Sequence, residues 1–233
     1  SGEVTKIPTH AFAIGDAMYL AYMSVSHWGD AGMWDAGYSG LAKSIDQGQT
    51  WTQVEGVRWP GDSNFIQFAT VQVREGGTDY VYLWALPAGR FARVALTRVP
   101  ATTDAVEDAG AYSYFTGTDA SGSPKWSAQM DDAAIVLDGT IGEMSVMYSN
   151  YLERWLMTYS DGGSAYMREG LTPWGPWGDP LEIVSGTEYP GLYAPYMNPR
   201  YVSDDGRTVY FDLSQWGPYN VFWFSVHLDK VSG

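Results

Sequence analysis

Residues 44–51 read Ser-Ile-Asp-Gln-Gly-Gln-Thr-Trp, an octet of the form Ser-x-Asp-x-Gly-x-Thr-Trp. Asp46 can hydrogen-bond the backbone of its own turn, and Gly48 can adopt the positive φ angle that a tight hairpin needs. Trp51 offers a large ring that can pack back between neighbouring sheets. The octet therefore predicts a hairpin between two outer strands, in which Asp46 has a structural role.

The chain around this octet consists of short runs rich in Val, Tyr, Phe and Trp, separated by Gly, Asp, Asn or Pro, with no helical period. This pattern predicts an all-β fold. The runs form four repeated units, each of which starts with an inner strand and moves outward. The predicted strands are 11–14, 17–24, 40–44 and 50–54; then 65–73, 80–85, 91–99 and 112–116; then 142–148, 154–159, 165–169 and 180–184; and finally 193–200, 208–213 and 220–228.

Four such units predict a β-propeller, because sialidase-type propellers use the Ser-x-Asp-x-Gly-x-Thr-Trp turn between the outer strands of a blade. The fourth unit shows no outer strand. Propellers close by borrowing a strand across the termini, so we expect the closing strand upstream of Ser1 or at residues 3–7. Residues 100–139 carry many Asp, Ala, Gly and Ser, which predicts a surface insertion. The whole chain, 1–233, is predicted to be a single propeller domain with this insertion.

The composition restricts the class of partner. The chain has 13 Lys+Arg against 27 Asp+Glu, a formal net charge of -14, which argues against nucleic acid and acidic membrane surfaces. It has no cysteine, hence no disulfide or thiolate metal site, and no apolar run of membrane-spanning length. The 11 Trp, 17 Tyr and 8 Phe suit a carbohydrate ligand, although the packing of propeller blades also uses aromatic rings.

Two segments join polar and aromatic side chains where a loop leaves a strand. The first is Ser-His-Trp-Gly at 26–29, in which His27 could donate a hydrogen bond to a sugar hydroxyl or transfer a proton; a structural histidine is the alternative. The second is Leu-Pro-Ala-Gly-Arg-Phe at 86–91, in which Arg90 could orient a carboxylate or a hydroxyl; a plain loop cation is the alternative.

A third segment, Gly-Glu-Met-Ser-Val-Met-Tyr at 142–148, places a carboxylate at the start of an apolar inner strand. A charge there is costly unless it is paired or functional. Glu143 is therefore the leading candidate for the general acid of a glycoside hydrolase. Such an enzyme normally uses a second carboxylate about 5 to 9.5 Å away. The alternatives for that second acid are Asp35, Asp132 and Asp212, each near a strand end, where an exposed turn residue is the simpler interpretation.

Eight short motifs occur in order along the chain: Thr-Lys-Ile-Pro-Thr at 5–9, His-Trp-Gly at 27–29, Tyr-Ser-Gly at 38–40, Pro-Ala-Gly-Arg-Phe at 87–91, Gly-Glu-Met-Ser-Val at 142–146, Arg-Trp-Leu-Met-Thr-Tyr at 154–159, Tyr-Pro-Gly-Leu-Tyr at 189–193 and Trp-Gly-Pro-Tyr-Asn-Val at 216–221. Together they resemble an actinobacterial family known as a domain of unknown function. Its members include endo-D-arabinanases, glycoside hydrolases that cut the D-arabinan of mycobacterial arabinogalactan and lipoarabinomannan.

The resemblance implies a secreted or cell-envelope-associated hydrolase of furanosidic linkages in a cell-wall arabinan. Glu143 is expected to protonate the leaving oxygen, and this mechanism requires no metal. Propellers often hold a structural cation on their axis, and the resemblance leaves such a cation as an alternative. A non-catalytic glycan-binding propeller is the rival interpretation, because no second acid stands out. The residues expected to bind substrate are His27, Trp28, Asp35, Arg90, Tyr148, Tyr193, Trp216 and Asn220.

The resemblance also implies five blades, of which this sequence shows four. The additional blade is expected from a separate N-terminal segment that completes the propeller. The alternatives are a trimmed chain, a blade supplied by another chain, or a shortened relative that closes with four blades.

Overall fold

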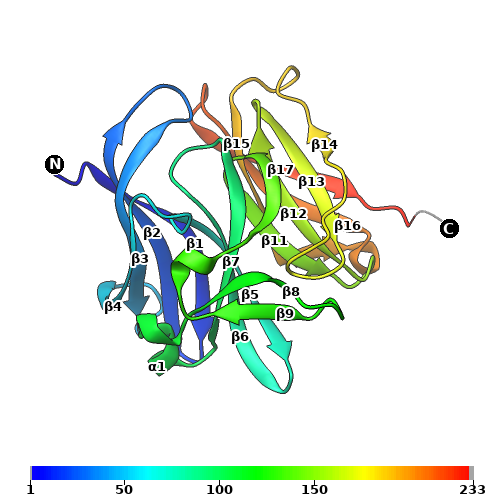
Figure 1. Cartoon of the computed structure of the whole chain (residues 1–233). Coiled ribbons are helices and arrows are strands. Elements are labelled where there is room, and N and C mark those ends of the chain that lie inside the picture. The colour runs from blue at the N-terminus through cyan, green and yellow to red at the C-terminus, as the bar shows by residue number, and fades with distance from the viewer. Residues whose placement is uncertain (1, 231–233) are drawn as a thin grey trace. The chain divides into compact units, whose positions relative to one another are not determined.

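A computed structural model describes residues 2–230. The structure is nearly all-β, with four antiparallel sheets that correspond in order to the four predicted units (Figure 1). The predicted fold class, a β-propeller with four blades in this chain, is confirmed. The chain divides into two compact units, with the boundary between Gly139 and Thr140, and each unit contains two of the sheets.

The first sheet has the order β1-β2-β3-β4. Its inner strand is longer than predicted, and it includes most of the segment 3–7 that was expected to close the fourth unit. The second of the two expected sources of the closing strand, residues 3–7, is therefore wrong, because that segment pairs with β2 through Thr5↔Val25 and its neighbours. The strands are β1 (Thr5–Ile14), β2 (Ala17–Trp28), β3 (Trp34–Ser44) and β4 (Thr52–Pro60).

The octet forms the turn between β3 and β4. Asp46 accepts hydrogen bonds from the Thr50 hydroxyl (2.6 Å) and the Thr50 amide (2.9 Å), which lower the pKa of its carboxyl group to about 2. Gly48 has the expected positive φ of 85°. The Trp51 indole N–H donates to the Gly48 carbonyl at 3.0 Å, and the ring is 37% exposed, so Trp51 closes the turn itself.

The second sheet has six strands, with the path β5-β6-β7-β8-β9 and with β10 paired to β7. Part of the predicted insertion, 100–139, therefore extends this sheet, and the rest forms short helical turns such as α1 (Thr103–Val106). The strands are β5 (Gln67–Glu75), β6 (Thr78–Leu86), β7 (Ala92–Pro100), β8 (Ser113–Thr118), β9 (Pro124–Ser127) and β10 (Ile135–Ile141).

The third and fourth sheets have the orders β11-β12-β13-β14 and β15-β16-β17. Their shared core contains Leu156, Phe211 and Leu213, all almost fully buried. Two hydroxyl groups link these sheets: Ser145 on β11 donates to the Met197 carbonyl on β15, and Thr158 on β12 donates to the Pro195 carbonyl on β15 at 2.6 Å. The strands are β11 (Met144–Ser149), β12 (Arg154–Asp161), β13 (Ser164–Gly170), β14 (Leu181–Val184), β15 (Leu192–Ser203), β16 (Thr208–Gln215) and β17 (Asn220–His227).

Candidate functional site

Two of the predicted site segments meet at one end of the first two sheets. The β2–β3 hairpin carries His27 and Trp28, and the β6–β7 loop carries Arg90. The backbone N–H of Arg90 donates a 3.0 Å hydrogen bond to the carbonyl of Gly32 in the hairpin. Gly32 has a φ of 79°, and a Cβ atom there would lie 3.2 Å from the Phe91 ring. The close approach of the two loops therefore depends on glycine at this position.

A buried amide holds the β6–β7 loop in place. Gln67 begins β5 and is only 4% exposed. Its Nε2 donates 2.8 Å hydrogen bonds to the carbonyls of both Pro87 and Gly89. Since two loop carbonyls use the donor hydrogens of one rigid side chain, the loop is fixed relative to the strand that precedes it.

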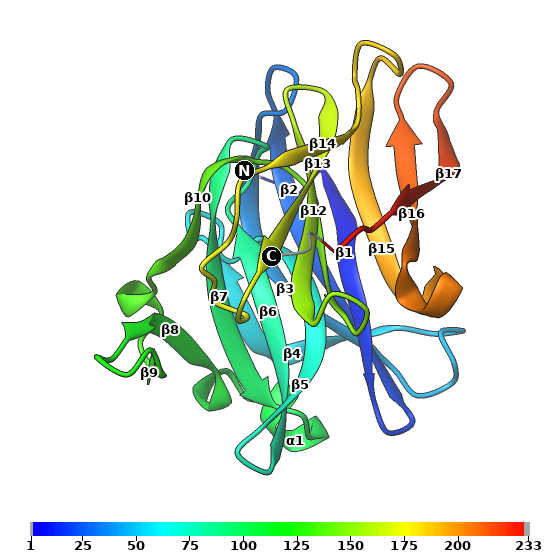
Figure 2. The same cartoon turned by 90° about the vertical axis from the view of Figure 1, so that its right-hand side faces the viewer.

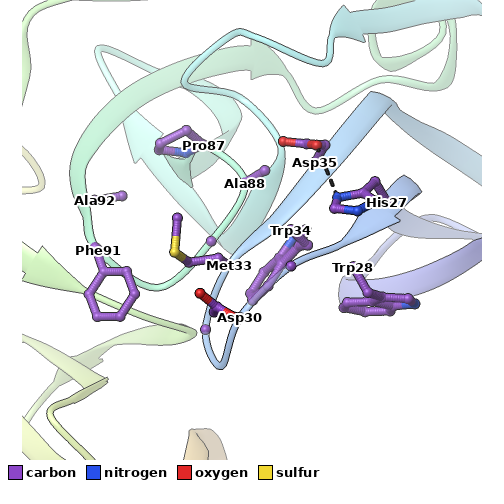
Figure 3. A pocket seen from close by; sticks show the side chains of 13 residues that line it. His27, Trp28, Asp30, Met33, Trp34, Asp35, Pro87, Ala88, Phe91 and Ala92 are labelled. Atoms are coloured by element: carbon purple, nitrogen blue, oxygen red, sulfur yellow. Dashed lines mark ion pairs between the residues drawn. The ribbon is translucent and has the colours of Figure 1, made fainter.

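The hairpin and the loop enclose an open pocket of about 880 Å³ (Figure 3). Its apolar wall includes the indoles of Trp28 and Trp34, whose ring centres are 6.1 Å apart, together with Met33 and Phe91. Trp28 is 49% exposed. Exposed, neighbouring aromatic faces of this kind can stack on the apolar face of a sugar ring.

Polar groups converge on the same pocket. The Nδ1 of His27 lies 3.4 Å from a carboxylate oxygen of Asp35, and both side chains are largely exposed. Asp30 also lines the pocket. The guanidinium of Arg90 lies 5.8 Å from the centre of the Trp34 ring, a cation–π distance. The pocket thus combines aromatic walls with hydrogen-bond donors and acceptors, and three predicted residues line it: His27, Trp28 and Asp35.

Glu143 lies in the other unit, one residue before β11, and not inside the predicted strand 142–148. The Ser160 hydroxyl donates a 2.8 Å hydrogen bond to its Oε2. A backbone hydrogen bond joins the same two residues: the Ser160 N–H donates to the Glu143 carbonyl at 3.2 Å. The carboxylate is half-buried and fixed at the entrance to an inner strand.

Two further predicted segments meet at the start of β15. The Trp216 N–H donates to the Gly191 carbonyl at 2.9 Å, and the Gln215 amide donates to the Pro190 carbonyl at 2.9 Å. Tyr193 follows directly in β15. Within this sheet, Trp216 is highly exposed, Asn220 is exposed at the start of β17, and Tyr193 is half-buried.

Tyr148 lies apart from Glu143. It lies in β11, five residues after Glu143, which at the usual rise of a strand separates the two residues by about 16 Å. There it packs edge-on against Trp155, with the ring centres 5.4 Å apart.

The three candidates for a second carboxylate lie in different places. Asp35 is in the pocket with His27. Asp132 lies in a short helical turn of the insertion and accepts a hydrogen bond from Ser127. Asp212 is in β16, opposite Tyr196, and partial desolvation raises the pKa of its carboxyl group. Of the three, only Asp212 is in the same unit as Glu143.

Over residues 2–230, no group of three or more His, Asp or Glu side chains is arranged to hold a metal ion. No helix in that part of the chain is long and apolar enough to cross a membrane.

The sequence reasoning missed several residues that shape these sites. Asp30 and Met33 line the pocket, but nothing in their local pattern distinguishes them from ordinary loop residues. Gln67 could have been found from the sequence. It is a polar amide between the apolar runs Phe65-Ile66 and Phe68-Ala69, a pattern that indicates a buried side chain with hydrogen-bond partners. Ser160 could not have been found in this way, because its hydrogen bond to Glu143 depends on the pairing of β12 with the segment before β11.

The chain has the same fold as solved propeller glycoside hydrolases. An exo-β-1,3-galactanase from Phanerochaete chrysosporium matches 92% of this chain and 44% of its own, with a TM-score of 0.58 and 12% identity. An α-L-arabinofuranosidase from Clostridium thermocellum matches 97% of this chain and 70% of its own (TM-score 0.53, 13% identity). A family 43 endo-arabinanase from Bacillus licheniformis matches 94% of this chain and 72% of its own (TM-score 0.51, 10% identity). The chain spans about half the length of several of the matching structures, with 57%, 44% and 49% covered in three cases.

No curated protein shows significant sequence similarity to this chain. The family described as a domain of unknown function, DUF4185, matches residues 1–225. This match extends over almost the entire sequence and includes the β2–β3 hairpin, the β6–β7 loop, Glu143 and the start of β15. The chain therefore belongs to the DUF4185 family.

Proposed function

We propose that this protein is a glycoside hydrolase that cleaves furanosidic linkages in a D-arabinan, such as that of mycobacterial arabinogalactan or lipoarabinomannan. The observation that carries the proposal is the pocket in which the Trp28 and Trp34 indoles stand beside the His27–Asp35 pair. Aromatic faces next to hydrogen-bonding groups are what a neutral sugar needs, and the chain's net charge of -14 does not oppose such a ligand.

The fold similarity supports the reaction class. The solved relatives named above include an enzyme named as an α-L-arabinofuranosidase and another named as an endo-arabinanase. The D-arabinan substrate rests on the sequence motifs that resemble the endo-D-arabinanases.

In the proposed reaction, Glu143 transfers its proton to the glycosidic oxygen as the bond to the anomeric carbon breaks. Water then adds to that carbon and releases a proton, which restores the acidic form of Glu143. The Ser160 hydroxyl holds the Glu143 carboxyl group in position. The proposed apolar contacts to sugar rings are Trp28 in the first unit and Tyr193 and Trp216 in the second. His27, Asp35, Arg90 and Asn220 bind hydroxyl groups.

The first test is incubation of the purified chain with mycobacterial arabinogalactan, followed by chromatography of the released oligosaccharides. A Glu143→Gln variant keeps the shape of the side chain but has no acidic proton. Glu169→Gln is the matched control, since Glu169 is an exposed carboxylate on β13 of the same unit. We expect release by the native chain and by the control, and none by Glu143→Gln.

A non-catalytic glycan-binding propeller is the second candidate. It is favoured because no second acid for Glu143 stands out in the sequence, and the Glu143 Oε2 atom already accepts a hydrogen bond from the Ser160 hydroxyl group. Retained binding of arabinogalactan by the native chain without any release of oligosaccharides would support this candidate and contradict the hydrolase.

The proposed substrate implies where the protein works. An arabinan of the cell wall lies outside the membrane, so the protein is proposed to be secreted or attached to the cell envelope. A separate N-terminal segment is proposed to add a fifth blade, which agrees with the greater length of the matching hydrolases. Comparing oligosaccharide release by the 233-residue chain with release by a longer natural polypeptide tests whether that segment is needed.

A further inference from the structure

One methionine differs from the others of this chain in its exposure. All nine methionines lie within residues 2–230; six of them are buried, each with no more than 7% of its surface exposed, and Met18 and Met130 are partly covered. Met33 is 55% exposed and lies in the hairpin that joins β2 to β3, drawn in blue in Figure 2. A peroxide oxidises a thioether only where it can reach the sulfur atom, so Met33 is expected to react before the other eight.

Hydrogen bonds of the hairpin fix the backbone at Met33. Its N–H donates a 2.8 Å bond to the Asp30 carbonyl, and its own carbonyl accepts a 3.0 Å bond from the Gly29 N–H. The next residue, Trp34, begins β3 and packs against Trp28. The Met33 side chain therefore stays at the pocket and cannot be withdrawn from it by a shift of the turn.

Met33 belongs to the apolar wall of the pocket. Figure 3 shows its side chain between those of Phe91 and Trp34, and all three residues line the cavity. A thioether is apolar and polarisable, and it makes favourable contacts with aromatic rings. A sulfoxide is polar and needs a hydrogen-bond donor. Asp30, which lies in the same turn and lines the same pocket, offers a carboxylate, which is an acceptor like the sulfoxide oxygen and cannot pair with it.

We propose that Met33 is a site of reversible oxidation, at which a hydroperoxide forms the sulfoxide and thereby weakens the binding of a glycan in the pocket. The lone pair of the sulfur attacks one peroxide oxygen, so that an S–O bond forms and the O–O bond breaks. The leaving hydroxide takes up the proton of the transferred OH group and departs as water. Sulfur is oxidised by two electrons, and the peroxide is reduced by two. The effect on binding rests on the proposed function, whereas the selective oxidation of Met33 does not.

Hydrogen peroxide is the probe for the first part of the test. The purified chain is treated for increasing times, and peptide mass spectrometry follows the gain of one oxygen atom at each methionine. We expect Met33 to be oxidised at least about 10-fold faster than any other methionine. Equal rates at all exposed and partly covered methionines, or faster oxidation of Met18 or Met130, would overturn the proposal.

Titration calorimetry with soluble arabinan oligosaccharides, before and after treatment, is the second part. Oxidation should weaken binding by the native chain about 5-fold, and methionine sulfoxide reductases should restore it. Met33→Leu cannot form a sulfoxide, so its affinity after treatment should equal its own affinity before treatment. Met130→Leu is the matched control, since Met130 lies in the insertion and does not line the pocket. It should respond to peroxide as the native chain does.

The thermal unfolding midpoint separates loss of binding from loss of structure. Because Met33 is exposed, its oxidation should leave the midpoint unchanged. Undiminished affinity after complete oxidation of Met33, or an equal loss of affinity in Met33→Leu, would overturn the proposal. A native chain that binds no arabinan before treatment would contradict the proposed function, and with it the effect on binding, whereas mass spectrometry would still identify the oxidised residue.

Discussion

The Oγ of Ser160 donates a 2.8 Å hydrogen bond to Oε2 of Glu143, and a backbone bond joins the same two residues. The hydroxyl group therefore holds the carboxyl group in one orientation at the entrance to β11. If Glu143 is the proton donor, Ser160 is its positioning residue.

Ser160→Ala should lower kcat for arabinogalactan hydrolysis about 10-fold, because a hydrogen bond to an ionisable group contributes about 1.5 kcal/mol or more. KM should change little. Ser164→Ala is the control, since Ser164 bonds the exposed carboxylate of Glu182 at 3.3 Å in the same unit. Full activity of Ser160→Ala alongside an inactive Glu143→Gln would show that the hydroxyl group does not position the acid.

Gln67→Leu should weaken both the fold and the pocket. It leaves the carbonyls of Pro87 and Gly89 without their donor, a loss of about 2 kcal/mol in the free energy of unfolding. The β6–β7 loop should become mobile, and the affinity for soluble arabinan oligosaccharides should fall. Chemical denaturation and titration calorimetry measure the two effects. Gln72→Leu removes an exposed amide from the same strand. Water can replace its hydrogen bond to the Ala13 carbonyl, so this control should change neither.

The strand order could be predicted because its signals are local. Period-two alternation and turn residues such as the Gly76-Gly77 and Gly162-Gly163 pairs, which all adopt positive φ, mark each hairpin within a few residues. Strand ends depended on tertiary pairing and were less accurate. β1 extends back to Thr5 because β2 offers a pairing partner across a register shift near Pro8.

Some residues at the pocket could be selected from the sequence, but not their arrangement. His27, Trp28 and Arg90 stood out as polar and aromatic residues at loop positions. That their two loops meet follows from the packing of neighbouring sheets, through the bond from Arg90 to Gly32 and the amide of Gln67. No local pattern encodes such a contact, since its partners are 58 and 22 residues apart.

The turn of the octet contains backbone strain that glycine would relieve. Gln47 has a φ of 61° and an exposed side chain, and a residue with a Cβ atom pays about 1 kcal/mol for this conformation. Gln47→Gly should raise the free energy of unfolding by about 0.5 kcal/mol. Gln49→Gly, at an exposed position of the same turn without positive φ, should lower it. Thermal unfolding of the three proteins compares them directly, and a lower midpoint for Gln47→Gly would contradict the strain argument.

His10 should make the stability of the protein sensitive to mild acid. Burial lowers the pKa of its imidazole to about 4, from 6.5 for an ordinary histidine, and its Nδ1 lies 2.8 Å from the hydroxyl of Thr70 in β5. The unfolded chain therefore takes up a proton near pH 6.5, whereas the folded protein does so only near pH 4. The stabilisation is complete above pH 6.5 and is lost as the pH falls towards 4.

This linkage amounts to a loss of about 1.4 kcal/mol at pH 5.5 and about 3 kcal/mol at pH 4. Urea unfolding of the native chain and of His10→Gln between pH 7.5 and 4 measures it, because glutamine retains a hydrogen-bonding group but does not titrate. The difference in pH dependence between the two proteins should match these values. His27→Gln, which replaces a largely exposed histidine, should keep the native dependence. If His10→Gln loses stability in acid as steeply as the native chain, other groups must account for the effect, and the imidazole of His10 is not the residue that couples this fold to pH.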